Sequence, residues 1–180
     1  MEDARRCGIL ARRGLDETTR EEYSRLITER IAASPQFQQA KTVMLYRSVR
    51  GEVCLDGLRG CGKRLVYPLC VNGTEMIALH PLEEDAWTEG SYGIPEPIPQ
   101  RSPEVSPEEI DLVICPCTAF DEEGHRMGMG AGYYDRFLPQ CSRAFIAAAA
   151  FECQKAELQP KPWDVPMQCV FTERTTYYAK

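Results

Sequence analysis

The sequence lacks a long apolar segment. Its longest apolar run, from Ala144 to Phe151, is far shorter than the about 20 residues that a membrane-spanning helix needs. The first residues, Met1 to Arg5, contain no apolar core of the kind that a secretory signal carries. We therefore expect a protein that neither crosses a membrane nor is exported by that route.

No two cysteines have the C-x-x-C spacing, and their number, nine, is odd. Neither a disulfide framework nor a zinc ribbon is therefore indicated. Cys115 and Cys117 are too close for the usual zinc spacing, and only His80 and His125 could complete such a site. We interpret the cysteines as small apolar fillers in a reducing compartment, and we predict a cytoplasmic protein. They are Cys7, Cys54, Cys61, Cys70, Cys115, Cys117, Cys141, Cys153 and Cys169.

Positive charge is also scarce. The net charge is −6 and the isoelectric point is about 5.1, which disfavours general nucleic-acid binding, because that needs many lysines and arginines. A local group, Arg5, Arg6, Arg12 and Arg13, is compatible with an anionic ligand or with a solvated helix face. The length of 180 residues and the hydrophobic fraction of 43% predict one soluble globular domain over residues 1–180.

Strand-like and helix-like patterns alternate along the chain, which predicts an α/β fold with a largely parallel sheet. A first helix is expected over residues 4–13. Asp16 begins a capping segment for a second helix, whose Ile27 and Ile31 share one face. Strands are expected over 42–46, 64–67 (ended by Pro68), 76–79, 111–115, 144–150 and 168–172, further helices over 55–61 and 132–138, and an ordered surface loop over 83–107.

The segment from Phe120 to Leu138 lies between a predicted buried strand and a predicted helix. Gly128, Gly130 and Gly132 alternate within it. Glycines there let backbone N–H groups approach a phosphate closely, and a following helix would present its positive end to the anion. The spacing matches neither the P-loop nor the dinucleotide-binding G-x-G-x-x-G pattern. Taken alone, the alternation is also typical of a tight turn that binds nothing.

Four other side chains in the same connection favour a ligand-binding loop. Arg126 could clamp a phosphate through charge-assisted hydrogen bonds. Asp135, one turn into the predicted helix, could hold Mg²⁺ beside that phosphate. Tyr133 and Tyr134 offer a flat face and two hydroxyls to a ring-shaped substrate. Together with the glycines, these residues make a ligand loop the better interpretation.

The pattern Phe-Asp-x-x-Gly-x-Arg-Met-Gly-Met-Gly-x-Gly-Tyr-Tyr-Asp-Arg-Phe-Leu resembles the signature of the 5-formyltetrahydrofolate cyclo-ligase family, also called methenyltetrahydrofolate synthetases. This signature is specific, and the resemblance covers nearly the whole chain. Other blocks are weak singly and persuasive in their order. They are Arg5 and Leu15, Tyr46 to Glu52, Tyr92 to Pro97, Phe151 to Gln154, Trp163 to Met167, and Thr172 with Glu173.

The resemblance implies a three-layer α/β sandwich that converts 5-formyltetrahydrofolate and ATP to 5,10-methenyltetrahydrofolate, ADP and phosphate. ATP would phosphorylate the formyl oxygen, and N10 of the folate would then attack the activated carbon. Phosphoryl transfer needs positioning and cationic stabilisation, so no residue is assigned as acid, base or nucleophile. The implied partners are small molecules, with no nucleic acid or membrane, and the implied state is a monomer or weak homo-oligomer.

The family's functional positions carry over residue by residue. Glu52, Met129 and Tyr133 correspond to the folate pocket, and Asp135 and Asp164 to ligands of Mg²⁺, the implied cofactor. The nucleotide site corresponds to Arg5 and to Arg126, Met127, Gly128, Met129, Gly130, Ala131, Gly132, Tyr133 and Tyr134.

Three positions depart from the family pattern. Met1 replaces a usual lysine, Ala131 occupies a position that is often Lys or Gly, and Gln168 stands where Asp is common. Two alternatives therefore stay open. One is a catalytically weak nucleotide- or folate-binding module of the same fold, and the other is a related ATP-dependent enzyme for another formylated or pterin-like substrate.

Overall fold

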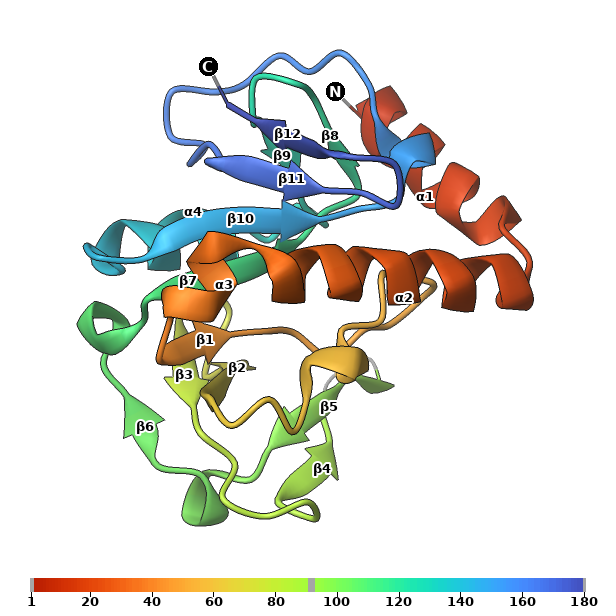
Figure 1. Ribbon diagram of the computed structural model, residues 1–180. Helices are drawn as coiled ribbons and strands as arrows, with labels where there is room; N and C mark the ends of the chain where they lie inside the picture. The colour runs from red at the N-terminus through yellow and green to blue at the C-terminus, as the bar shows by residue number, and fades with distance from the viewer. Residues whose placement is uncertain (1, 91–92, 180) are drawn as a thin grey trace.

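The computed structural model describes residues 2–90 and 93–179, and its centre is one eight-stranded sheet (Figure 1). The strand order is β12-β11-β10-β7-β1-β2-β3-β6. These strands are β1 (Thr42–Met44), β2 (Arg64–Cys70), β3 (Met76–Leu79), β6 (Glu104–Val105), β7 (Leu112–Pro116), β10 (Phe145–Ala149), β11 (Cys169–Phe171) and β12 (Thr176–Tyr178). Two separate ribbons pair β4 (Trp87–Glu89) with β5 (Pro95–Pro97) and β8 (Ala119–Phe120) with β9 (Arg126–Met127). The α-helices are α1 (Glu2–Gly14), α2 (Glu17–Ala33), α3 (Pro35–Gln39) and α4 (Tyr133–Phe137).

The middle of the sheet is parallel. Strands β2, β1, β7, β10 and β11 run in the same direction and lie side by side in that order. Most residues of β7 and β10 are buried, which suits apolar strands that are covered on both faces. Antiparallel pairing adds β12 at one edge and β3 with β6 at the other. The predicted α/β class with a largely parallel sheet is confirmed.

Helices cover both faces of this sheet. Ile27 and Ile31 of α2 and Phe37 of α3 pack against one face, and α2 lies across the middle of the sheet in Figure 1. Phe137 and Leu138, at the end of α4, pack against the other face. The result is a three-layer sandwich, as the sequence resemblance implies.

Helix α1 lies at the carboxyl edge of the sheet and not on a face. A Cβ atom added at Gly8 would lie 1.9 Å from the carbonyl oxygen of Thr118, two residues beyond β7. The 3-10 turn that follows β10, Glu152–Gln154, also contacts α1. Since open α/β sheets bind ligands outside the carboxyl ends of their strands, α1 is placed beside the expected site.

Two predicted segments have another secondary structure than expected. The helix expected over residues 55–61 is only a 3-10 turn, Asp56–Leu58, because Gly60 and Gly62 have φ values of 75° and 74°, which end a right-handed helix. The loop expected over residues 83–107 contains β4, β5 and β6 with two 3-10 turns, Pro99–Arg101 and Pro107–Glu109.

Pro68 does not end its strand. Strand β2 continues to Cys70 and pairs with β3 there, whereas its pairing with β1 stops at Val66. Pro68 therefore lies where β2 has lost one neighbour, and a missing amide is tolerated.

The interpretation of the cysteines as apolar fillers holds for only part of the set. Cys115, Cys117, Cys141 and Cys169 are buried, but Cys7, Cys61, Cys70 and Cys153 are exposed, and all nine are free thiols. The exposed thiols lie in contact with solvent and fill no core volume. Among the described residues, no helix has the length and apolarity needed to span a membrane.

Candidate functional site

The glycine-rich loop connects the β8–β9 hairpin to α4 near the carboxyl end of β7. Gly130 and Gly132 have φ values of 108° and 70°, which residues with a side chain rarely adopt. At Gly128, a Cβ atom would lie 3.2 Å from Nη1 of Arg126. Gly130 and Gly132 are thus favoured by their backbone conformation, and Gly128 is favoured by the limited space beside Arg126. The predicted contribution of a helix N-terminus is small, because α4 has only five residues.

Arg5 reaches this loop from α1. Its Nε donates a 2.8 Å hydrogen bond to the carbonyl oxygen of Gly128, and a Cβ atom at Gly130 would lie 3.4 Å from Arg5 Nη1. Arg6 and Arg13 of the same basic group are exposed, so the solvated interpretation fits those two. The structure therefore brings one N-terminal cation onto the predicted nucleotide loop.

Arg126 lies beneath the loop with a side chain that is only 4% exposed. Its Nη2 is 2.9 Å from Oδ1 of Asp135, and its Cζ is 5.3 Å from the centre of the Tyr134 ring. Within the part of the chain that the structure describes, Arg126 Nε has no hydrogen-bond partner. An unpaired buried N–H is costly, so this donor lacks the compensation that a hydrogen-bond partner would give.

The two predicted magnesium ligands lie on segments that touch. Oδ1 of Asp135 is 3.4 Å from the backbone nitrogen of Val165, while Oδ2 of Asp164 accepts a 2.8 Å hydrogen bond from Lys161 N. Bond lengths then limit the distance from Asp135 Oδ1 to the Asp164 side-chain oxygens to at most about 10 Å. The turn that contains Asp164 therefore folds back against α4, as a shared Mg²⁺ site requires. The shared Mg²⁺ site itself stays a prediction.

Glu52 is buried beside Arg12. Arg12 Nη2 lies 3.6 Å from Glu52 Oε1, with side chains 1% and 10% exposed, and Val49 N donates to Oε2 at 3.1 Å. Burial raises the pKa of Glu52, and the positive charge of Arg12 partly offsets that rise. Arg50 and Gly51, with φ values of 53° and 77°, make the left-handed turn that brings Glu52 back toward the sheet.

The hydroxyls of Tyr46 and Tyr134 share this interior with Glu52. Tyr46 donates a 3.0 Å hydrogen bond to the carbonyl oxygen of Val53. Burial raises the pKa of both hydroxyls well above the ordinary value, and the Glu52 carboxylate adds to the rise. The charge of Glu52 therefore acts on both Tyr46 and the signature residue Tyr134, and both tyrosines stay protonated at neutral pH.

The other predicted folate residues lie nearer the surface. Met129 is 51% exposed. The Tyr133 hydroxyl donates a 2.9 Å hydrogen bond to Asn72 O, and its ring lies 5.4 Å from the guanidinium of Arg136. Of the remaining loop residues, Met127 is buried and Ala131 is exposed.

Comparison with known proteins decides the family. The sequence profile described as the 5-formyltetrahydrofolate cyclo-ligase family matches residues 3–173. The chain belongs to this family. It is 30% identical to the 5-formyltetrahydrofolate cyclo-ligase of Escherichia coli (strain K12) over 172 residues, which are 89% of this chain and 93% of that protein. The cyclo-ligase of Haemophilus influenzae is 32% identical over 139 residues, which are 72% of this chain and 74% of that protein.

A solved structure shows the same fold. The NMR structure of the Aquifex aeolicus 5,10-methenyltetrahydrofolate synthetase matches with a TM-score of 0.88 and 29% identity, covering 99% of this chain and 92% of that one. The family resemblance and the α/β sandwich expected from the sequence are therefore both confirmed.

The departures from the cyclo-ligase pattern have different outcomes. Met1 lies outside the described residues, as does Tyr92 of the loop block. The Ala131 carbonyl accepts a 2.8 Å hydrogen bond from Arg136, which closes the glycine loop. Gln168 has a structural role. Its side-chain Oε1 accepts a 2.8 Å hydrogen bond from Ile146 N, and its backbone N–H donates a 2.7 Å hydrogen bond to Ile146 O. These bonds extend the contact between β10 and β11.

Two buried residues near the cyclo-ligase signature were not predicted to be important. Arg12 appears in the sequence only as part of a basic group, although its spacing of seven from Arg5 places both on one helix face. Gln154 is 2% exposed, and its Nε2 donates 3.0 Å hydrogen bonds to the carbonyl oxygens of Cys117 and Thr118. In the sequence, Gln154 stands out only because it belongs to the Phe151-to-Gln154 block of the family resemblance.

One cluster of possible metal ligands lies in the turn of the β8–β9 hairpin. Ligand atoms of Asp121, Glu123 and His125 lie within 4.8 Å of one another. Asp121 already accepts hydrogen bonds from His125 Nδ1 at 2.8 Å and from the backbone N–H groups of Glu123 and His125. These bonds shape the turn, so His125 has a structural role in the hairpin loop.

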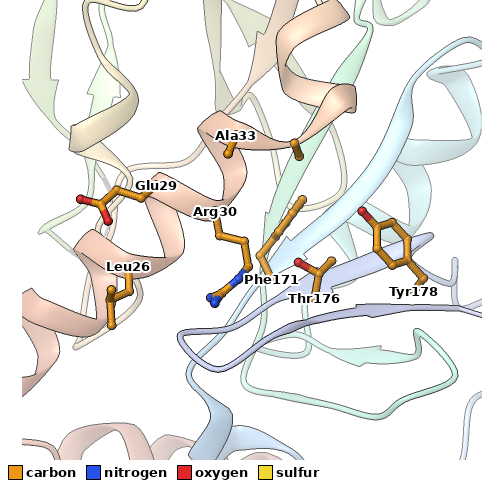
Figure 2. Close-up of a pocket in the computed structure, with 8 residues that line it drawn as sticks. Leu26, Glu29, Arg30, Ala33, Phe171, Thr176 and Tyr178 are labelled. Carbon is orange, nitrogen blue, oxygen red and sulfur yellow. The ribbon is translucent and has the colours of Figure 1, made fainter.

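A surface groove lies elsewhere, between α2 and the β11–β12 hairpin. Figure 2 shows its lining, with Arg30 of α2 lying near Phe171 and Thr176. The lining residues are Leu26, Glu29, Arg30, Ala33, Ser34, Phe171, Thr176 and Tyr178. This set includes none of the predicted site residues.

Proposed function

We propose that this chain catalyses the ATP- and Mg²⁺-dependent cyclisation of 5-formyltetrahydrofolate to 5,10-methenyltetrahydrofolate, with release of ADP and phosphate. Membership in the cyclo-ligase family supports the folate reaction. The observation that carries the ATP part is the contact of Arg5 with a loop whose Gly130 and Gly132 are left-handed. Such a loop lets backbone amides approach phosphates, and a cation from another helix adds charge.

In this proposal, the phosphates of ATP lie along residues 126–134. Arg5 and Arg126 supply positive charge from two sides of the loop, and the unpaired Nε of Arg126 donates to a phosphate oxygen. Arginine suits this role because its guanidinium matches the oxygens of a phosphate. Positioning of this kind is the main protein contribution to phosphoryl transfer.

Asp135 and Asp164 fit Mg²⁺ by the chemistry of their donor atoms, since carboxylate oxygens are hard ligands that the ion prefers. The contact of Asp135 with Val165 brings both segments to the same side of α4. When bound, Mg²⁺ neutralises charge on the transferring phosphates.

Glu52 accepts hydrogen bonds from the N–H groups of the pterin ring in this assignment, and Met129 with Tyr133 forms the outer wall of the pocket. The γ-phosphoryl group passes to the formyl oxygen, N10 attacks the formyl carbon, and phosphate leaves. No protein nucleophile is required. The nearby thiols of Cys115 and Cys117 are suited to no such role, because burial raises the pKa of each to about 12.

The remaining expectations belong to the same proposal. A net charge of −6 and a reaction between small molecules favour a protein without nucleic-acid or membrane partners. We infer a single cytoplasmic domain over residues 1–180 that works as a monomer or weak homo-oligomer.

The test is to mix the purified protein with MgATP and 5-formyltetrahydrofolate and to follow the near-ultraviolet absorbance of the methenyl product. Omission of ATP or Mg²⁺ should abolish the signal. Arg5→Ala should lower the rate, whereas Arg13→Ala, an exposed change on the same helix, should not. Thermal stabilisation by both ligands without product would indicate a binding module. Product from another formylated substrate alone would indicate the related enzyme.

A further inference from the structure

Arg12 and Glu52 form the most deeply buried of the ion pairs found within residues 2–90 and 93–179, with side chains 1% and 10% exposed. A buried charge is expensive unless partners compensate it. Glu52 is one of the residues assigned to folate, with a side chain that is 10% exposed. The proposed reaction gives Arg12 no role.

Arg12 is held in place independently of Glu52. Its Nη1 donates to the carbonyl oxygen of Cys117 at 3.3 Å, and that oxygen also accepts from Gln154 Nε2 at 3.0 Å. The guanidinium is therefore fixed against the carboxyl end of β7. Its charge reaches Glu52 from a position just beyond a mostly buried central strand.

Glu52 keeps acceptor capacity despite its burial. Val49 N donates to Oε2 at 3.1 Å. Oε1 faces Arg12 at 3.6 Å, which is longer than a hydrogen bond of about 3 Å. The contact is therefore mainly electrostatic, and Oε1 can still accept a hydrogen bond from a ligand.

We propose that Arg12 is a positioning residue for folate recognition: it keeps Glu52 a carboxylate, with one oxygen left to accept from the N–H groups of the pterin ring. A protonated Glu52 would lose its negative charge and part of its acceptor capacity, and recognition of those N–H groups would weaken. The proposal rests on the folate role proposed above for Glu52.

The surroundings of Glu52 determine the expected pH dependence. The charged and titratable groups that interact electrostatically with Glu52 come from several elements. They are Arg12 of α1, Tyr46 after β1, Arg50 in the following turn, Cys117 after β7 and Tyr134 of α4. Burial raises the pKa of Glu52, and Arg12 is the largest opposing influence. Without Arg12 the pKa rises further, so the carboxylate, and with it folate binding, should appear only at higher pH.

The experiment measures folate affinity, MgATP affinity, KM and kcat over a range of pH for the wild type, Arg12→Met and Arg12→Lys. Arg13→Met is the control. For Arg12→Met we expect folate affinity to fall about 10- to 100-fold at neutral pH, with MgATP affinity nearly unchanged and KM for folate affected more than kcat. The pH midpoint of folate binding should move upward. Arg12→Lys should recover most of the affinity, and Arg13→Met should match the wild type.

A second comparison uses Glu52→Gln. If Arg12 acts through the Glu52 charge, Arg12→Met should cost no further folate affinity in the Glu52→Gln background, whereas a purely structural role would make the losses add. The double variant also removes both buried charges, so it remains informative if Arg12→Met alone does not fold. Additive losses, an unchanged pH midpoint or equal loss of MgATP binding would each overturn the inference. Failure of the wild type to bind folate would instead overturn the proposed function.

Discussion

Replacing Gly8 with alanine tests whether the contact between α1 and the end of β7 organises the site. The added Cβ would lie 1.9 Å from the carbonyl oxygen of Thr118 and 3.0 Å from its carbonyl carbon. Both are backbone atoms, which cannot rotate away as a side chain does. Helix α1 must therefore move outward by about 1 Å or more, since packed carbon atoms need separations of about 3.5 Å.

Two opposing effects determine how much Gly8→Ala changes the free energy of unfolding. Alanine is favoured over glycine inside a helix by about 1 kcal/mol. Overpacking costs about 1–3 kcal/mol, and a rigid backbone contact belongs at the upper end. The net loss should be about 2 kcal/mol, which lowers the melting temperature by about 4–8 °C in a protein of this size. The displacement should also weaken the contacts of Arg5 with Gly128 and of Arg12 with Glu52.

Denaturation with and without MgATP and 5-formyltetrahydrofolate checks this prediction. Gly8→Ala should lower stability and reduce the stabilisation that each ligand provides. Gly14→Ala is the matched control, because it changes the same helix at a position with nothing within 4 Å, and it should preserve ligand binding. A Gly8→Ala protein that is as stable as the wild type, with full ligand stabilisation, would refute the placement of α1 against Thr118.

Other changes test single parts of the site. Glu52→Gln should weaken folate binding and leave MgATP binding nearly intact, as measured by titration; equal loss of both would mean a structural role. Asp135→Asn and Asp164→Asn should stay folded by circular dichroism and lose most activity, with partial rescue by raised Mg²⁺, because each removes charge that balances the ion; full activity in both would argue against a shared site. Gly130→Ala, at a φ of 108°, should lose about 1–3 kcal/mol of stability and much of the stabilisation by MgATP, whereas Gly73→Ala, with open space around it, should change neither.

The central strands and the second helix were predictable from local chemistry. Apolar runs such as Leu112–Cys115 suit only a strand covered on both faces. The start of α2 follows from Asp16, whose side chain accepts a 2.8 Å hydrogen bond from Thr19 N. The position of the glycine loop beyond a buried strand also follows from the order of the elements.

Short and marginal elements were not predictable in this way. Strands β6 and β12 lie at the two edges of the sheet and form only by pairing with β3 and β11. The turn at Asp56–Leu58 has a helix-like composition, but nearby glycines stop it. Pairing partners and a few dihedral angles decide these cases, and neither is visible in a short window of sequence.

The difference between Arg5 and Arg12 shows where local reasoning ends. Both are arginines on one face of the same predicted helix, and the sequence with its family resemblance was sufficient to nominate Arg5 and Glu52. Burial of Arg12 depends on Glu52 and on the Cys117 carbonyl, which is 105 residues away in the chain. A guanidinium leaves water only where other elements supply charge and acceptors to replace its hydration. Those partners come together only when the sheet and α1 have packed, so the tertiary structure alone decides which arginine lies inside.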